Sequence, residues 1–213
     1  AGEMLATVGR NASLRSLTSS ADKVKVDATG TLTVTTAKAA TQVDLSGRAG
    51  LTATTLTSTN AFINVDSLAG SVNVKTANAR TYFNANSYGA MTLGTFGVTA
   101  GYASLVSGAA MAITKGTSTG NMSIDGGTNA ALGTLTSSAG FIDAAALNGG
   151  MTFATLRAAS KIKLDATQAW SNGQAISGTA LYVSNGDLDL FAASGGISLT
   201  TLSGKTQSSV KTN

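Results

Sequence analysis

The stretch LTVTTAKAATQVDL, residues 32–45, holds the two patterns that decide the fold. Its first six residues run apolar, any, apolar, any, threonine, apolar, and its last three run apolar, polar, apolar. Alternation with a period of two places successive side chains on opposite faces of a β-strand. We therefore expect two short strands here, 32–37 and 43–45, with a turn between them.

Both patterns recur along the chain. The first begins at Ala12, Leu32, Leu51, Val72, Met91, Met111, Ala130, Met151 and Ile197, and successive starts through Met151 are separated by a nearly constant interval. The second follows slightly more than half a period later, at Val24/Val26, Val43/Leu45, Ile63/Val65, Phe83/Ala85, Ala103/Leu105, Met122/Ile124, Ile142/Ala144 and Ile162/Leu164. A repeat this short cannot bury an apolar face by itself, so the repeats must stack on one another. The period predicts an all-β solenoid of parallel strands, with about ten coils of about 20 residues.

The composition fits this fold and excludes several classes of function. Ala, Thr, Gly and Ser fill 117 of the 213 positions, and the 51 β-branched residues disfavour helical repeats of this length. Proline is absent, as expected where nearly every strand is hydrogen-bonded on both edges. Cysteine and histidine are also absent, which excludes disulfides, cysteine zinc sites, Ser-His-Asp triads and histidine metal ligands.

Stacking also predicts which side chains share a column. The third position of the first pattern should point inward and be nearly fully buried, at Leu14, Val34, Val74, Leu93, Ile113, Leu132 and Phe153. Equivalent residues of adjacent coils lie about 4.8 Å apart, so Lys25 should lie beside Asp44, and Asp143 beside Lys163, on the outer face. Corners that require unusual backbone angles are expected two residues before a first pattern, at Gly30, Gly70, Gly89, Gly149 and Gly195.

The repeat breaks at about residues 165–180. The stretch from Met151 to Ile197 is longer than two regular coils. It contains Trp170 and the turn signal Asn172-Gly173, so we expect an irregular coil with an inserted loop. The strand phase after about residue 165 stays open. We expect residues 1–213 to form a single β-helix segment that begins in mid-repeat, as a piece excised from a longer fibre would.

Polar columns offer few candidates for chemistry. One column consists of threonines, at Thr36, Thr55, Thr76, Thr95, Thr134, Thr155 and Thr201. A flat threonine ladder would order water, as in ice-binding solenoids, but threonine at a turn more often hydrogen-bonds the backbone. Aspartates follow the second strand at Asp27, Asp66, Asp125 and Asp165, on different coils, as turn-capping aspartates do. The calcium-binding nonapeptide signature does not recur. We therefore expect no catalytic residue, no metal site and no cofactor.

Arg157, Lys161 and Lys163 form the most compact basic group. We expect them to bind acidic or sulfated glycan, such as heparin, weakly and electrostatically. Lys161 and Lys163 should point outward because Ile162 and Leu164 occupy the inward positions of that strand.

The net charge is only +4, aromatic residues make up 5%, and no glycine-rich phosphate loop is present, so no nucleic-acid binding is expected. No apolar run is long enough to cross a bilayer, so no membrane span is expected.

Three sequence segments resemble those of a known family: GTLTVTT (30–36), GDLDL (186–190) and GGISLTTL (195–202). Through these segments, its regular short period and its small-residue composition, the chain resembles the repeat region of filamentous haemagglutinin-like exoproteins. These large bacterial adhesins leave the cell by two-partner secretion, and the group includes contact-dependent inhibition proteins.

The resemblance implies a right-handed parallel β-helix that is secreted to the bacterial cell surface through an outer-membrane secretion partner. It implies a non-enzymatic structural shaft of an adhesin, with attachment to host or neighbouring cells and a role in virulence. Host glycans or a cell-surface receptor would be the partners. Two alternatives stay open: a β-solenoid that binds or degrades polysaccharide, and an ice-binding solenoid.

Overall fold

The computed structural model describes residues 2–169, 173–204 and 208–212. These residues form 21 strands, and they include no helix that could cross a membrane. The odd-numbered strands are β1 (Met4–Val8), β3 (Val24–Ala28), β5 (Val43–Gly47), β7 (Ile63–Ser67), β9 (Tyr82–Ser87), β11 (Tyr102–Ser107), β13 (Met122–Gly126), β15 (Phe141–Ala146), β17 (Lys161–Ala166), β19 (Asp187–Ala192) and β21 (Ser208–Thr212). The even-numbered strands are β2 (Ala12–Ser19), β4 (Thr31–Ala39), β6 (Gly50–Ser58), β8 (Val72–Ala79), β10 (Met91–Val98), β12 (Met111–Ser118), β14 (Ala130–Ser137), β16 (Met151–Ala158), β18 (Gln174–Val183) and β20 (Gly196–Ser203).

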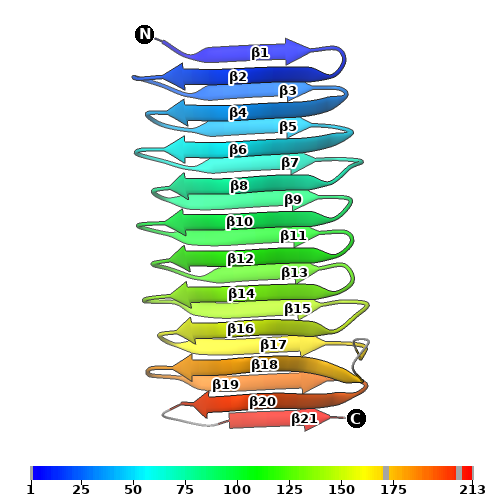
Figure 1. Cartoon of the computed structure of the whole chain (residues 1–213). Helices are drawn as coiled ribbons and strands as arrows, with labels where there is room; N and C mark the ends of the chain where they lie inside the picture. The colour runs from blue at the N-terminus through cyan, green and yellow to red at the C-terminus, as the bar shows by residue number, and fades with distance from the viewer. Residues whose placement is uncertain (1, 170–172, 205–207, 213) are drawn as a thin grey trace.

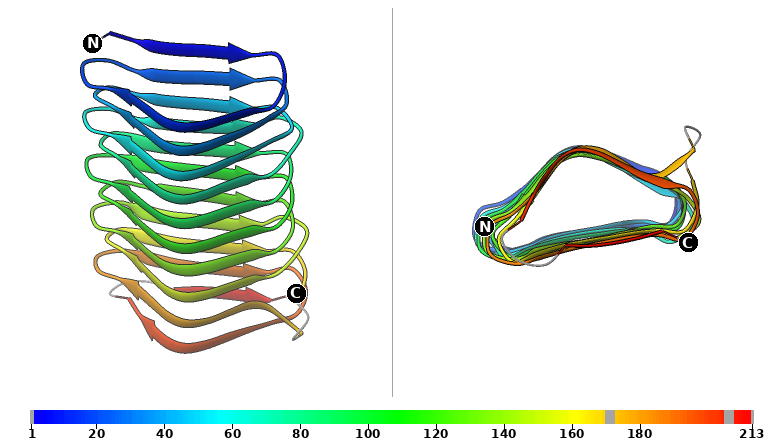
Figure 2. Two further views of the ribbon diagram at one scale, coloured as in Figure 1. Left: turned by 45° about the horizontal axis from the view of Figure 1, so that its top comes forward. Right: turned by 90° about the horizontal axis from the view of Figure 1, so that it is seen from below.

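The strands form two parallel sheets that face each other. Each coil adds one strand to each sheet, so the odd-numbered strands are hydrogen-bonded in sequence order, and so are the even-numbered strands. Figure 1 shows the coils stacked along one axis, and the chain winds in a right-handed sense (Figures 1 and 2). The predicted fold, a parallel β-solenoid of about ten coils of about 20 residues, is confirmed.

The core is continuous from the first coils to the last, and apolar side chains from both sheets fill it. Six of the seven predicted inward residues are buried: Val34, Val74, Leu93, Ile113, Leu132 and Phe153. Leu14 is only half-buried, so that prediction was wrong. The reason is its place in the stack: β2 pairs with β4 alone, so no described coil covers the other side of Leu14.

Large and small side chains compensate each other within a column. Gly116 breaks the apolar pattern at its sixth position, and a Cβ there would clash with the ring of Phe96 on the neighbouring coil. A Cβ on Gly178 would clash in the same way with the ring of Phe153. Each ring therefore fills the space that a glycine on the next coil leaves free, as close packing requires.

The corner glycines serve close approach rather than unusual backbone angles. Of the five glycines expected to need such angles, only Gly195 has a positive φ, at 86°. At Gly70 a Cβ would clash with the carbonyl group of Ala49 on the coil before. Glycine is required there because the backbones of successive turns come too close for any side chain.

The even-numbered sheet bends and the odd-numbered sheet does not. In the ladder between β4 and β6, Val34 pairs with Ala53 and Thr36 with Thr55, but the intervening Thr35 and Thr54 do not pair. The same position is skipped in the other even-numbered ladders. Seen along the axis, one side of each coil is kinked and the opposite side is nearly straight (Figure 2). The straight sheet therefore presents a flat outer face.

The irregular coil lies between β17 and β18. Met151 pairs with Ile176, and Ile176 pairs with Ile197, so the first of these two coils is the longer one. Its additional length falls in the connection between the strands, residues 167–173, and Trp170 and Asn172 lie outside the described residues. The structure also defines the strand phase after about residue 165, which the sequence left open. Leu181 pairs with Leu156 in the even-numbered sheet, and Leu188 pairs with Ile162 in the odd-numbered sheet.

Buried serines close the turns. The Ser118 hydroxyl lies 2.7 Å from the carbonyl oxygen of Gly101 on the preceding turn and 2.9 Å from that of Gly120 on its own turn. Ser137 repeats the arrangement one coil later, with its hydroxyl 2.7 Å from the Gly120 oxygen. The serine hydroxyls thus add donors to turn carbonyls, of which that of Gly101 also accepts from the Gly120 N–H, and they link these coils to one another.

Candidate functional site

The flat outer face of the odd-numbered sheet carries most of the distinctive side chains. Its central column, one residue per coil, runs Lys25, Asp44, Asn64, Asn84, Ser104, Ser123, Asp143, Lys163 and Asp189. A second column, two residues further along each strand, runs Asp27, Ser46, Asp66, Asn86, Val106, Asp125, Ala145, Asp165 and Phe191. Equivalent residues stack at the strand spacing, so neighbours within a column interact directly.

The two predicted ion pairs on this face are confirmed. The Lys25 ammonium lies 3.5 Å from the Asp44 carboxylate, and Lys163 lies 3.7 Å from Asp143. The carboxylates of Asp44, chiefly, and of Asp27 raise the pKa of Lys25. All of these side chains remain partly exposed, so each pair contributes only about 0–1 kcal/mol to stability.

The structure separates the three predicted glycan-binding residues. Lys161 and Lys163 lie on β17 in the odd-numbered sheet, with their ammonium groups 3.9 Å from Asp189 and 3.7 Å from Asp143. Arg157 lies on β16 in the other sheet, and its guanidinium stacks 3.9 Å from the centre of the Tyr182 ring. The lysines therefore share a face and already have acidic neighbours, whereas Arg157 lies beyond the intervening turn. Glycan binding by this group stays a prediction.

An aromatic stack borders the central column, and our sequence reasoning missed it. The rings of Phe62 and Tyr82 are parallel, with centroids 4.4 Å apart, and those of Tyr82 and Tyr102 are 5.3 Å apart. Burial, mainly, raises the pKa of Tyr82. The signal was present in the sequence, because Phe62, Tyr82 and Tyr102 follow one another at an interval of one coil.

The most unusual polar group lies beside this stack, in the middle of the face. Asn64 and Asp66 on β7 and Asn84 and Asn86 on β9 form two registered rows that line an open hollow of about 470 Å³. The Oδ1 atoms of Asn64, Asp66 and Asn84 are buried and accept no hydrogen bond from any described residue. Burial is also the main cause that raises the pKa of Asp66. Buried acceptors without donors are uncommon in folded proteins and call for an explanation.

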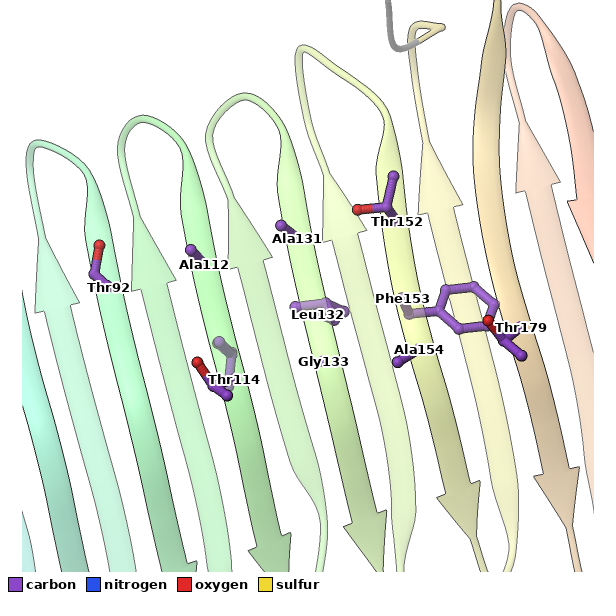
Figure 3. Close-up of a pocket in the computed structure, with 11 residues that line it drawn as sticks. Thr92, Ala112, Thr114, Ala131, Leu132, Gly133, Thr152, Phe153, Ala154 and Thr179 are labelled. Atoms are coloured by element: carbon purple, nitrogen blue, oxygen red, sulfur yellow. The ribbon is translucent and has the colours of Figure 1, made fainter. Parts of the chain in front are cut away.

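The bent sheet offers a different surface. A hollow of about 500 Å³ runs across β12, β14 and β16, and Figure 3 shows small side chains in two rows along it. The rows are Thr92, Ala112, Ala131 and Thr152, and Thr114, Gly133, Ala154 and Thr179. The lining contains no ionisable side chain, so it offers none for proton transfer.

The predicted threonine column also lies on the bent sheet. Thr36, Thr55, Thr76 and Thr95 are aligned in register, and Lys115 then interrupts the column. The hydroxyl groups that hold the turns in the described residues are chiefly those of the buried serines. The threonine column therefore has four uninterrupted members at most before a charged side chain enters it.

No group of three or more carboxylates that could hold a metal ion lies within the described residues. The chain matches no protein-family model, and neither the curated proteins nor the solved structures include a significant match. The resemblance to haemagglutinin-like repeats therefore rests on the sequence patterns, and the structure adds the β-solenoid itself.

Proposed function

We propose that the chain is a non-enzymatic structural shaft of a secreted, cell-surface filamentous adhesin of the haemagglutinin-like, two-partner-secretion type. One observation supports this most: both sheets continue without interruption through all the coils, so the cross-section repeats along the rod. At one strand spacing per coil, the rod is about 50 Å long. Such a shaft displays binding groups at a distance from the cell and resists bending through its paired strands.

A shaft of this type extends by adding coils. Among the described strands, β1, β2, β20 and β21 each pair with one neighbour only, so their outer edges offer unpaired backbone groups. Exposed strand edges of this kind promote association with other strands.

Attachment would rest on charge. Lys161 and Lys163 on the flat face, and Arg157 on the other sheet, would contact acidic or sulfated glycans of host or neighbouring cells. Because the contacts are few and exposed, binding would fall steeply as salt screens them over about 10 Å at 0.1 M.

Surface display tests the proposal. The chain is fused behind a two-partner secretion domain, and adherence to epithelial cells is compared with that of bacteria displaying the secretion domain alone. The proposal expects export and increased adherence. Failure of export, or adherence equal to the control, would contradict the adhesin role.

Heparin chromatography then locates the binding group. The wild-type chain should be retained, and an Arg157/Lys161/Lys163→Ala variant should elute at a lower salt concentration. Equal retention of the two would rule out glycan binding by these three residues.

The alternative of polysaccharide degradation predicts new reducing ends when the chain is incubated with a panel of acidic polysaccharides, and the adhesin proposal predicts none.

A further inference from the structure

The oxygen-rich group at the centre of the flat face suggests a ligand that accepts electron pairs. Asn64 and Asn84 are registered partners on adjacent strands, and Asp66 lies on the same face two residues after Asn64. The strand geometry sets these positions about 4.8 Å apart across strands and about 6.6 Å apart along one strand. Three short side chains with oxygen termini therefore surround one small area of the sheet.

Three oxygens in this area lack donors. The Oδ1 atoms of Asn64, Asp66 and Asn84 are shielded from solvent, and no N–H or O–H in the described part of the chain donates to them. A buried acceptor left in this state destabilises the folded chain. All three line the same hollow, so one bound species can satisfy all of them.

The charge of the area favours a cation. Asp66 forms no ion pair with any described residue, and Lys25, the nearest lysine of the column, contacts Asp44 and Asp27. The carboxylate of Asp44 adds further negative charge, which acts with burial to raise the pKa of Asp66. The Asn86 side chain hydrogen-bonds the Asp66 carboxylate and so orients it.

We propose that Asn64, Asp66 and Asn84 bind a calcium ion, with water completing its coordination. Calcium takes carboxylate and amide oxygens at about 2.3–2.6 Å, so two ligands on opposite sides of the ion lie about 5 Å apart, close to the spacing of one coil. Magnesium is disfavoured because it demands near-octahedral geometry and retains its waters. With one direct carboxylate the site binds weakly, in the range of about 10⁻⁴–10⁻³ M typical of extracellular modules.

This site departs from the sequence-based expectation of no metal, which rested on the spread of the aspartates over different coils. The spread of the aspartates does not exclude the site, because two of the three ligands are asparagine amides and only one aspartate is needed. The proposal is independent of the adhesin role.

Calcium titration tests the site. The melting temperature of the wild-type chain is followed by circular dichroism as CaCl₂ is added, with NaCl at matched ionic strength and with MgCl₂. The proposal expects a saturable rise with calcium that magnesium and sodium do not reproduce. Asp66→Asn keeps the shape and an oxygen but removes the charge, and it should raise the midpoint calcium concentration by roughly tenfold or more.

Asp125→Asn is the matched control. Asp125 lies in the same outward column, and burial raises its pKa as well, but its neighbours supply no unpartnered oxygens. This variant should keep the wild-type midpoint.

Terbium emission sensitised by Tyr82, which contacts Asn64, supplies a second readout and should disappear on adding excess calcium. No calcium effect on the wild type, equal midpoints for Asp66→Asn and wild type, or an equal effect of magnesium would each overturn the proposal.

Discussion

The two sheets of this solenoid are alike on the inside and different on the outside. Both sheets turn apolar columns inward, and Phe83 of one and Phe96 of the other meet with ring centroids 5.6 Å apart. Outside, the flat sheet carries the ion pairs, the aromatic stack and the oxygen-rich group, whereas the hollow on the bent sheet is lined by threonine, alanine and glycine beside apolar residues. Burial fixes the inner columns in every coil, and only the outer columns are free to acquire chemistry.

The largest expected effect tests the shared interior. Phe96→Ala should destabilise the chain by about 3–5 kcal/mol, because it removes a buried ring that also fills the space over Gly116. Chemical denaturation measures the free energy of unfolding.

A double-mutant cycle sharpens that result. Gly116→Ala should destabilise the wild type, since its Cβ would clash with the Phe96 ring, but should cost less in a Phe96→Leu background. Additive effects of the two substitutions would show that the ring and the glycine do not compensate each other.

A smaller effect is expected where the sheets meet at the turns. Ser118→Ala removes one of the donors to the carbonyls of Gly101 and Gly120, which keep the Gly120 N–H and the Ser137 hydroxyl, and should cost about 0.5–1.5 kcal/mol. Ser123→Ala, on the outer face of β13, is the control and should change stability by less than about 0.5 kcal/mol. Equal losses in the two variants would mean that the buried hydroxyl does not join the coils.

The outer ion pairs should matter less still. Lys163→Ala should lower stability by no more than about 1 kcal/mol, because the side chain is exposed and solvent screens its contact with Asp143. Repeating the thermal melts at low and at high NaCl concentration should show that salt removes most of the difference. A large loss that salt does not reduce would place the interaction in a less solvated environment than its exposure indicates.

The smallest effect concerns Asp66 without calcium. Burial, mainly, raises the pKa of Asp66 in the folded chain, so ionisation of this carboxyl group is disfavoured there. The folded chain therefore keeps its full stability with respect to this group below the ordinary pKa of aspartate, and it loses that stability as pH rises through the higher pKa of the folded state. Asp66→Asn should therefore raise the melting temperature slightly at pH 7 in chelator, by less than about 3 °C, and the gain should fade below about pH 4. A lower melting temperature at pH 7 would show that the carboxylate is satisfied within the protein.

The ion pairs on the flat face could be predicted from the sequence, but the oxygen-rich group of the proposed calcium site could not. The pairs Lys25–Asp44 and Asp143–Lys163 followed from the period alone, since parallel stacking places equivalent positions side by side. The unpartnered oxygens did not follow, because hydrogen-bond satisfaction depends on side-chain orientation. The separation of Arg157 from Lys161 has a different cause: the two sequence patterns already place them on different strands, and their closeness in sequence did not make them neighbours in space because a turn falls between the two sheets.

The sequence by itself determined the length of the coil, the inward columns and the parallel stack, because a strict period of apolar residues has few other ways to become buried. Only the tertiary structure decided which sheet is bent, how Phe96 and Phe153 fill the spaces over Gly116 and Gly178, and the strand phase after residue 165. These features depend on contacts between coils. The physical reason is that a one-dimensional pattern specifies which residues face inward, whereas the fit of each coil on the next is settled by volumes, backbone approach and hydrogen bonds in three dimensions.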